Sequence, residues 1–333
     1  MLRLTSRRGF TLAEMVLAFL LFSLVGGTIL TLVMRQQRFY RGAADVIRVH
    51  AQLRQGASVL PLDLRSVSTS DTLVNTSAGT KYNADIYAKA DWMVEFRRTF
   101  GTSVLCRIRA AARDTIFLVP KTLVSEAAIT TWGADPAVGD SLLILDEGKL
   151  LGAGDDRWRA YKVKAITTVT GTSGCPFNAD STTRHLLTVA DTSRPSYKIT
   201  LDRALETTFA APTPVRVFRR VRYEVYEAGD RQWYLGYSDC LDTYTTASKC
   251  SVITPVSGPY LPYTGVAKEN GLTFAYYDSL GNLLATTAES RRVARIGVVM
   301  RTETEHAVSR TGADMGEKYR DTVVLTIGIR NRR

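Results

Sequence analysis

The chain has few of the residues on which catalytic centres most often depend. Its 333 residues include only three histidines, His50, His185 and His306. None of them stands in a His-Glu-x-x-His motif or another metal-ligand spacing, and no Walker loop for phosphates occurs. The stretch from Gly171 to Gly174 lacks the Gly-x-Ser-x-Gly spacing of a nucleophile elbow. We therefore expect a chain that is not an enzyme and has no cofactor, although scattered catalytic residues would leave no such motif.

Cysteine is also scarce, and its spacing excludes the common zinc motifs. The four cysteines are Cys106, Cys175, Cys240 and Cys250, with no Cys-x-x-Cys pair and no Cys/His cluster. An even number of cysteines in an exported chain favours disulfides. Cys240 and Cys250 bracket the polar residues 241–249 and would close a loop, which leaves Cys106 and Cys175 as the second pair. Four free, buried thiols are the alternative.

Neither basic nor acidic residues form a dense cluster. The formal net charge is +11, and Arg3, Arg7 and Arg8 supply part of it. A basic surface attracts nucleic acid, anionic lipid or acidic proteins. Because the basic residues are scattered, nucleic-acid binding is the weaker interpretation. The adjacent Asp155 and Asp156 could contribute to a calcium site, but calcium requires more oxygen ligands than two neighbouring carboxylates provide, so no metal is expected.

A long uncharged run near the N-terminus is the strongest feature that the sequence does have. The twenty residues from Met15 to Met34 contain no charged side chain. As a helix they would span about 30 Å, the thickness of the hydrocarbon core of a membrane. The run is too long for a signal peptide, and no Ala-x-Ala cleavage site follows it. Arginines before it favour a cytoplasmic N-terminus, although arginines also follow it. A plain single-pass anchor is the simplest interpretation.

The residues before this run carry a specific motif, Arg7-Arg8-Gly9-Phe10-Thr11-Leu12-Ala13-Glu14. It resembles the recognition motif of type IV prepilins and type II secretion pseudopilins: a basic leader, glycine, an aromatic residue, Thr-Leu, and Glu as the fifth mature residue. The resemblance implies that a prepilin peptidase cuts between Gly9 and Phe10 and methylates the new N-terminus at Phe10. Residues 1–9 would then be a cleaved cytoplasmic leader.

Glu14 is a carboxylate at the start of an apolar span, where a charge is costly and needs a partner. The family resemblance implies that the terminal amine of a neighbouring subunit is its counter-ion in a filament. Glu14 would then set the axial register of assembly. A side chain that only reaches towards the membrane surface is the alternative.

Helical periodicity continues beyond the membrane span. We expect one helix of residues 10–60, with a transmembrane half and an amphipathic half, because Pro61 stops or kinks a helix. The amphipathic half should pack one stripe on a soluble head. That stripe consists of Phe39, Ala43, Val46, His50, Leu53, Ala57 and Leu60.

Residues 61–333 are expected to form a large, antiparallel β-rich head, which makes the fold class α+β. The polar stretch from Ser66 to Ala84 is expected to be a loop. Alternating β-branched and aromatic residues predict the strands that follow. The predicted strands of the middle region are Trp92–Arg97, Val104–Arg109, Thr115–Val119, Ser141–Leu145, Trp158–Thr168, Val215–Tyr226 and Gln232–Tyr237.

The C-terminal segment carries a second resemblance. Residues 271–278 alternate as a strand, residues 279–282 form a turn, and strands at 293–301 and 322–330 follow, ending in Arg330-Asn331-Arg332. This order resembles minor pilins and pseudopilins of the PilW-like and GspJ-like kind. The resemblance covers about the first sixty and the last sixty residues, whereas residues 66–266 resemble no family. A head of this size is easier to accommodate at a filament tip than along a dense shaft.

These features predict a minor pilin or minor pseudopilin, a structural subunit of a type IV pilus or a type II secretion pseudopilus. The resemblance implies four kinds of partner: prepilin peptidase, other major and minor pilins or pseudopilins, an inner-membrane assembly platform and membrane lipid. The expected location is the cytoplasmic membrane, with the head extracytoplasmic, and then the filament. The alternatives are a DNA-uptake minor pilin with a basic head, and a membrane-anchored extracytoplasmic enzyme.

Overall fold

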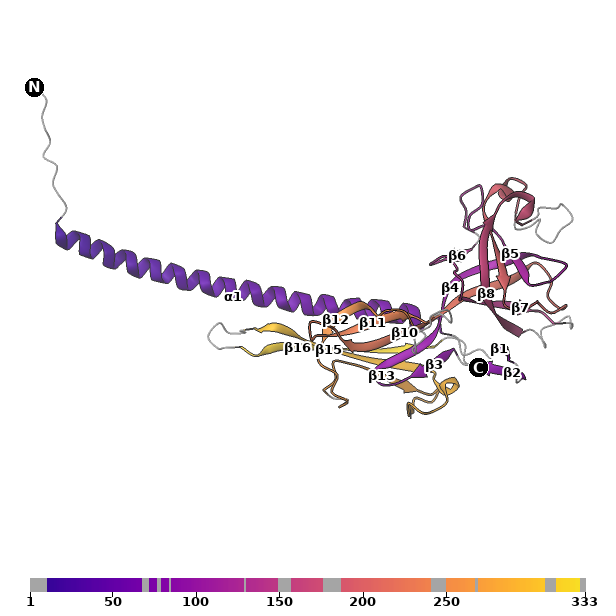
Figure 1. Ribbon diagram of the computed structural model, residues 1–333. Helices are drawn as coiled ribbons and strands as arrows, with labels where there is room; N and C mark the ends of the chain where they lie inside the picture. Colours follow the sequence, from indigo (N-terminus) through magenta and orange to yellow (C-terminus); the bar gives the residue numbers. More distant parts are fainter. Residues whose placement is uncertain are drawn as a thin grey trace, which may run out of the picture. The chain divides into compact units, whose positions relative to one another are not determined.

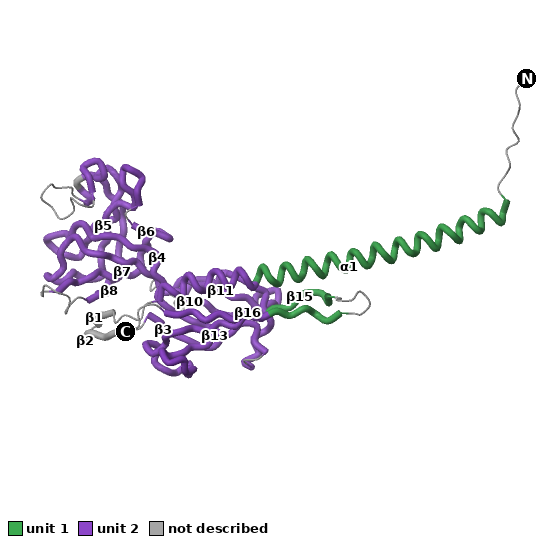
Figure 2. The backbone as a smooth tube through the Cα atoms, turned by 180° about the vertical axis from the view of Figure 1, so that it is seen from behind, with its two compact units in different colours: residues 1–52, 302–321 green, residues 53–301, 322–333 purple. Residues whose placement is uncertain are grey.

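The structure is a computed structural model that describes residues 11–67, 72–76, 79–83, 85–128, 130–148, 157–175, 187–240, 250–266, 269–308 and 316–329. The backbone divides into two compact units (Figure 2). Unit 1 consists of residues 1–52 and 302–321, and unit 2 of residues 53–301 and 322–333. One long N-terminal helix and large antiparallel sheets make the fold α+β, as predicted.

The N-terminal helix α1 runs without interruption from Leu12 to Leu64 (Figure 1). It contains a stretch that is long and apolar enough to cross a membrane, and the side chains of that stretch are exposed in the isolated chain. Apolar residues such as Phe22, which is 77% exposed, point outwards on every side. A helix that is apolar all round suits a lipid environment or the interior of an assembly.

The predicted end of the helix at Leu60 is wrong by one turn. Helix α1 continues through Pro61 and ends at Leu64. A proline inside a helix removes one backbone hydrogen bond. The last turn persists because Leu64 is completely buried and Asp63 is largely buried. Tertiary packing therefore outweighs the local effect of the proline.

The buried line of α1 also differs from the predicted stripe. Phe39, the first residue of the predicted stripe, is 70% exposed. Leu53 and Leu60 are buried as predicted, whereas four other members of the stripe lie one position after a buried residue: Ala43, Val46, His50 and Ala57. The helix packs through small and polar residues as well as apolar ones, and the prediction had no signal for the glycines and the aspartate. The buried line consists of Gly42, Asp45, Val49, Leu53, Gly56 and Leu60.

Gly56 shows why small residues lie on this line. A Cβ atom added there would lie 2.5 Å from the hydroxyl of Tyr260 and 2.8 Å from Sδ of Met300. Tyr260 belongs to β12 (Thr254–Tyr260) and Met300 to β15 (Arg295–Ala307). The helix backbone therefore rests directly on side chains of these strands, as glycine permits at a close helix contact.

Two long strands, β4 (Met93–Ile108) and β10 (Thr213–Glu227), organise unit 2. They pair antiparallel over almost their whole length, with a register shift between Val217 and Phe218. One half of this pair lies in an open sheet with β3 (Ile86–Lys89), β11 (Trp233–Asp239) and β12.

The other half of the β4–β10 pair closes into a barrel. The ring runs β4–β5–β9–β8–β7–β10 and returns to β4, and every pairing in it is antiparallel. Side chains fill the interior, so the barrel has a packed core. The added strands are β5 (Thr115–Leu118), β7 (Ser141–Asp146), β8 (Arg157–Val169) and β9 (Ser196–Leu201). Fully buried core residues include Leu105, Ile116, Leu118, Leu142, Ile144, Ile199 and Val217.

A second, four-stranded sheet follows towards the C-terminus. Its order is β14–β13–β15–β16, with β13 at Leu272–Tyr277, β14 at Leu283–Leu284 and β16 at Lys318–Gly328. The predicted turn after β13 is confirmed. The carboxylate of Asp278 accepts hydrogen bonds from the backbone N–H groups of Leu280 and Asn282, and Gly281 adopts a positive φ of 91°. Residues 330–332 lie outside the described residues.

The predicted loop at 66–84 is wrong in part. Strands β1 (Thr72–Thr76) and β2 (Gly79–Asn83) pair antiparallel within it. Threonine and valine favour strands, and a Ser/Thr/Asn-rich composition does not separate a polar strand from a loop. The shorter elements are β6 (Thr131–Trp132) and the 3₁₀ turns Gly171–Ser173, Ala190–Ser193 and Ser290–Arg292.

The strands predicted for the middle region are present, although two of the predicted segments belong to one strand. The two segments expected at 92–97 and 104–109 are parts of the single strand β4. A bend or bulge in a long strand interrupts the alternation that the prediction uses. The remaining predicted strands correspond to β5, β7, β8, β10 and β11.

Replacing Gly56 by Ala should destabilise the head. The added methyl group would collide with Tyr260 and Met300. We expect a net loss of about 1–2 kcal/mol in the free energy of unfolding, since overpacking outweighs the gain in helix propensity. Thermal unfolding of the detergent-solubilised chain measures the change. Gly27→Ala is the matched control, because no atom lies within 4 Å of its added methyl. Equal melting temperatures for the two variants would contradict the close contact.

Candidate functional site

Glu14 and Thr11 form a reciprocal hydrogen-bonded pair at the start of α1. The backbone N–H and the hydroxyl of Thr11 each donate to Oε2 of Glu14 over 3.0 Å. In return the backbone N–H of Glu14 donates to Oγ1 of Thr11 over 3.3 Å. This is a capping box, which satisfies otherwise unpaired N–H groups at a helix start. The carboxylate therefore has a partner within its own chain.

The capping box was missed in the sequence interpretation, which gave Glu14 a partner only in a neighbouring subunit. A threonine followed three residues later by glutamate, just before an apolar run, is the local signal for it. The predicted cleavage residues Gly9 and Phe10 lie outside the described residues. Cleavage and N-methylation there stay predictions.

Beyond the apolar span, α1 presents a second exposed line. Tyr40 and Ile47 are each 69% exposed, and Ala44 and Ala51 are also exposed. Their spacing of four, three and four residues places them on one face of the helix. Small and apolar residues at this spacing are typical of a face that packs against another helix.

At the other end of α1, Asp63 joins the helix to the open sheet of unit 2. Its Oδ1 lies 2.9 Å from Nε of Arg98, and its Oδ2 accepts a 2.6 Å hydrogen bond from the hydroxyl of Tyr223. Burial raises the pKa of Tyr223, and the nearby Asp63 carboxylate raises it further. Burial lowers the pKa of Arg98, but Asp63 together with the hydroxyls of Tyr237 and Tyr223 outweighs this effect, and the net shift is upward. Asp63 therefore holds the last turn of the helix against two strands, through Arg98 on β4 and Tyr223 on β10.

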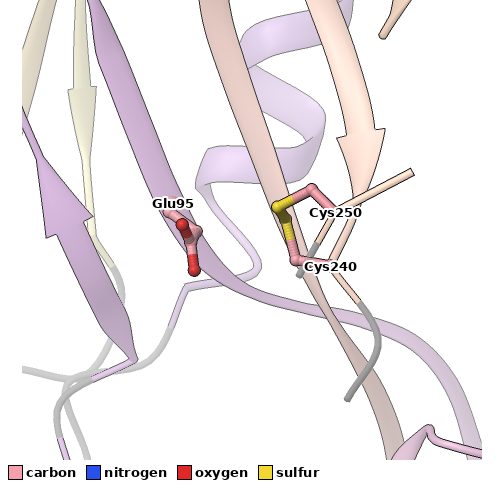
Figure 3. A group of neighbouring side chains, drawn as sticks. All are labelled: Glu95, Cys240 and Cys250. Atoms are coloured by element: carbon pink, nitrogen blue, oxygen red, sulfur yellow. A yellow bond between two sulfur atoms is a disulfide. The ribbon is translucent and has the colours of Figure 1, made fainter. Parts of the chain in front are cut away.

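A buried polar cluster lies around Glu95 on β4. Its side chain is 1% exposed and accepts hydrogen bonds from Arg220 and, over 2.8 Å, from Nη2 of Arg222. Figure 3 shows the carboxylate beside the disulfide between Cys240 and Cys250. Two thiolates and a carboxylate could hold a metal, but both sulfur atoms are committed to the disulfide. The cluster is therefore structural in this oxidised form.

The four cysteines form two disulfides, Cys106–Cys175 and Cys240–Cys250. The first joins β4 to the segment after the 3₁₀ turn at 171–173. It packs against Phe117 and other buried apolar residues. The second brackets residues 241–249, which lie outside the described residues. These are the pairs expected from the spacing of the sequence, and no described cysteine is free.

Arginines of unit 2 are paired with carboxylates in the interior. Arg219 lies 2.6 Å from Oδ1 of Asp140, and Arg97 lies 2.8 Å from Asp85. A hydrogen bond from Arg219 to the buried Asp140 raises the pKa of the guanidinium. These two arginines are neutralised by their partners and so add little to an electrostatic attraction for nucleic acid.

The remaining candidates are dispersed. His50 and His306 belong to unit 1, whereas His185 and the Asp155-Asp156 pair lie outside the described residues. The stretch from Gly171 to Gly174 forms a 3₁₀ turn next to Cys175, as its composition indicates. None of these observations tests catalysis, so the absence of enzymatic activity stays a prediction.

Comparison of the chain with known protein families, curated protein sequences and solved structures finds no match. The architecture is a long N-terminal apolar helix followed by an antiparallel β-sheet head with two disulfides. This arrangement resembles the type IV pilin fold.

Replacing Asp63 by Asn should weaken the attachment of the helix end. The change removes the charge that pairs with Arg98 and weakens the hydrogen bond from Tyr223. We expect the free energy of unfolding to fall by about 1–3 kcal/mol, as for a buried hydrogen-bonded group that loses its partner. Chemical denaturation measures it. If the contact is direct, Asp63→Asn combined with Tyr223→Phe loses less than the sum of the single changes.

Glu289→Gln is the control for this experiment, because it breaks the exposed pair between Glu289 and Arg291. Exposed pairs contribute little, so the control should unfold like the wild type. Additive losses in the Asp63 and Tyr223 variants would argue against direct coupling.

Proposed function

We propose that the chain is a structural subunit of a pilus-like filament, either a minor pilin or a minor type II secretion pseudopilin. One observation carries the proposal: α1 exposes apolar side chains on every side in its first half and buries a line of residues only in its second half. A helix of this kind can leave the membrane and exchange lipid contacts for contacts with other helices.

Processing and location follow from the same proposal. Prepilin peptidase would cleave between Gly9 and Phe10 and methylate the amine of Phe10. Before assembly, α1 would hold the chain in the cytoplasmic membrane, with the N-terminus cytoplasmic and the head extracytoplasmic. An inner-membrane assembly platform would then move the chain into a filament of major and minor subunits.

The capping box supports a two-state role for Glu14. In a single subunit, Thr11 supplies the hydrogen bonds of the carboxylate. Thr11 supplies no positive charge, so the carboxylate remains a charged group at the start of an apolar helix. A neighbouring terminal amine would neutralise it, and only one axial offset between two helices brings the two groups together. The charge pair would therefore select the register of assembly.

The exposed line Tyr40–Ala44–Ile47–Ala51 is a surface on which a neighbouring helix can pack. Burying its apolar area would contribute roughly 25 cal/mol per Å². Alanines at alternate positions permit close approach, and Tyr40 and Ile47 supply area. This face and the apolar span together would form the contact of α1 with its neighbours.

The barrel supports a place at the filament tip. The barrel enlarges unit 2 beyond the open sheet that packs on the end of α1. The head of each subunit is therefore bulky. A dense shaft has little room for it, whereas the tip has no neighbour above. Co-occurrence of its gene with pilus genes or with secretion genes would distinguish a pilus subunit from a secretion pseudopilin.

The internal pairing of arginines in unit 2 favours a structural subunit over a DNA-binding head. A DNA-uptake subunit would need a contiguous exposed basic surface and would bind DNA with a strong dependence on salt.

Mass spectrometry of the membrane-extracted chain tests the processing step. In cells with an active prepilin peptidase, the mature chain should begin at Phe10 and carry one methyl group on its amine. A Gly9→Val variant should keep its leader, because a bulky residue at the cleavage position blocks the peptidase. A full-length leader on the wild-type chain would refute the proposal.

The role of Glu14 is tested by Glu14→Gln. The variant should be cleaved and inserted normally, but its amount in sheared filaments should fall at least about tenfold, since the register-setting charge pair is lost. Immunoblotting of the filament and membrane fractions measures the distribution. Thr11→Val removes the capping hydroxyl and keeps the carboxylate, so it should assemble. Normal assembly of Glu14→Gln would eliminate the charge-pair mechanism.

A further inference from the structure

Unit 1 contains a group of potential metal ligands that the proposed function does not use. Asp45 lies on α1, and Glu305 and His306 lie near the end of β15. One ligand atom from each of the three lies within 4.8 Å of the other two. About 260 residues of sequence separate the helix residue from the strand residues, so only the fold brings them together.

The geometry within the group is close to that of a metal site. Nδ1 of His306 lies 2.9 Å from Oδ2 of Asp45. Two ligands of one tetrahedral zinc ion lie about 3.3 Å apart, given metal–ligand distances of about 2.0–2.2 Å. A small adjustment of the side chains would therefore open the position of an ion between them.

Burial distinguishes Asp45 from an ordinary surface acid. The residue is 7% exposed, and its carboxylate is held on the buried line of α1. The side chains of Glu305 and His306 are 70% and 63% exposed. One fixed ligand from a rigid helix and two adjustable ligands from a strand end would allow an ion to enter from solvent.

We propose that Asp45, Glu305 and His306 form a binding site for a divalent transition-metal ion of the zinc class, which would clamp the end of β15 to α1. The imidazole selects this class, because calcium and magnesium prefer oxygen ligands alone. Two carboxylates balance the two charges of the ion. Nδ1 coordinates when the ring carries its proton on Nε2, which solvent can reach. Three protein ligands leave a position for water.

In the metal-free state, the guanidinium of Arg48 supplies the positive charge that the ion would supply. Its Nη1 lies 3.4 Å from Oε2 of Glu305 and 3.9 Å from Oδ1 of Asp45. The arginine side chain is 61% exposed, so it can turn into solvent when an ion enters. Arg48 would therefore lower the affinity of the site, and its removal should raise it.

The site would act as a structural clamp. A metal that binds only the folded arrangement stabilises it by mass action. The clamp would hold the end of β15 against the helix within unit 1. It requires neither cleavage at Gly9 nor the charge of Glu14, so it stands or falls separately from the filament proposal.

Zinc titration of the full chain in detergent micelles tests the site. The chain is purified without a histidine tag and under oxidising conditions, so that its cysteines remain in disulfides. The background variant His50→Gln/His185→Gln leaves His306 as the single imidazole. Calorimetry should show one Zn²⁺ site in this background, and Ca²⁺ should bind at least about tenfold more weakly.

Substitutions in the same background assign the ligands. His306→Gln, Glu305→Gln and Asp45→Asn should each weaken Zn²⁺ binding at least about tenfold. Arg48→Gln should strengthen it. Because Glu305 is largely exposed, its replacement leaves the fold intact, and circular dichroism verifies this for each variant.

Absence of Zn²⁺ binding in the background variant would overturn the proposal. So would an affinity that His306→Gln or Glu305→Gln leaves unchanged, or tighter binding of Ca²⁺ than of Zn²⁺.

Discussion

The close contact between the last turns of α1, residues 53–64, and the strands of unit 2 is the constraint on which the rest of that unit depends. At Gly56 the helix backbone meets Tyr260 and Met300 with no room for a methyl group. At Asp63 a carboxylate joins the last turn to β4 and β10 through Arg98 and Tyr223. These contacts determine which face of the helix is buried. Because these contacts fix one face of the helix against the strands, the opposite face stays exposed and can bind other molecules.

Local patterns in the sequence predicted the helix and most strands. Long-range packing determined which helix residues are buried, where the helix ends and how the barrel closes. The apolar run and the alternating strands were predicted correctly, because each depends on residues close in sequence. The stripe of α1 was correct at Leu53 and Leu60 and was one position off at four other residues, since Gly42 and Gly56 have no apolar side chain to reveal their burial. The helix also outlasts Pro61, because Leu64 is buried by distant residues. Closure of the barrel depends on β7 pairing with β10, which no local pattern encodes.

The candidate site residues also divide into those that a local motif predicted and those that only the fold brings together. Gly9, Phe10 and Glu14 stand together in a short motif, and the cysteine pairs followed from spacing and an even count. The capping box of Thr11 was also readable locally but was overlooked. By contrast, Asp63 with Tyr223 and Asp45 with His306 combine residues far apart in sequence. Single acidic residues on a helix carry no signal of their distant partners, so these contacts required the structure.

The chain that completes the barrel leaves and rejoins the β4–β10 pair at directly paired residues. Leu105 on β4 is the direct partner of Thr213 on β10, so the intervening chain leaves and returns at adjacent points. A short turn could join these two positions and leave the open sheet and its helix contact unchanged. The intervening segment is therefore an insertion at one end of the paired part of β4 and β10. Its length and sequence could therefore change without altering the strand pairing of the open sheet.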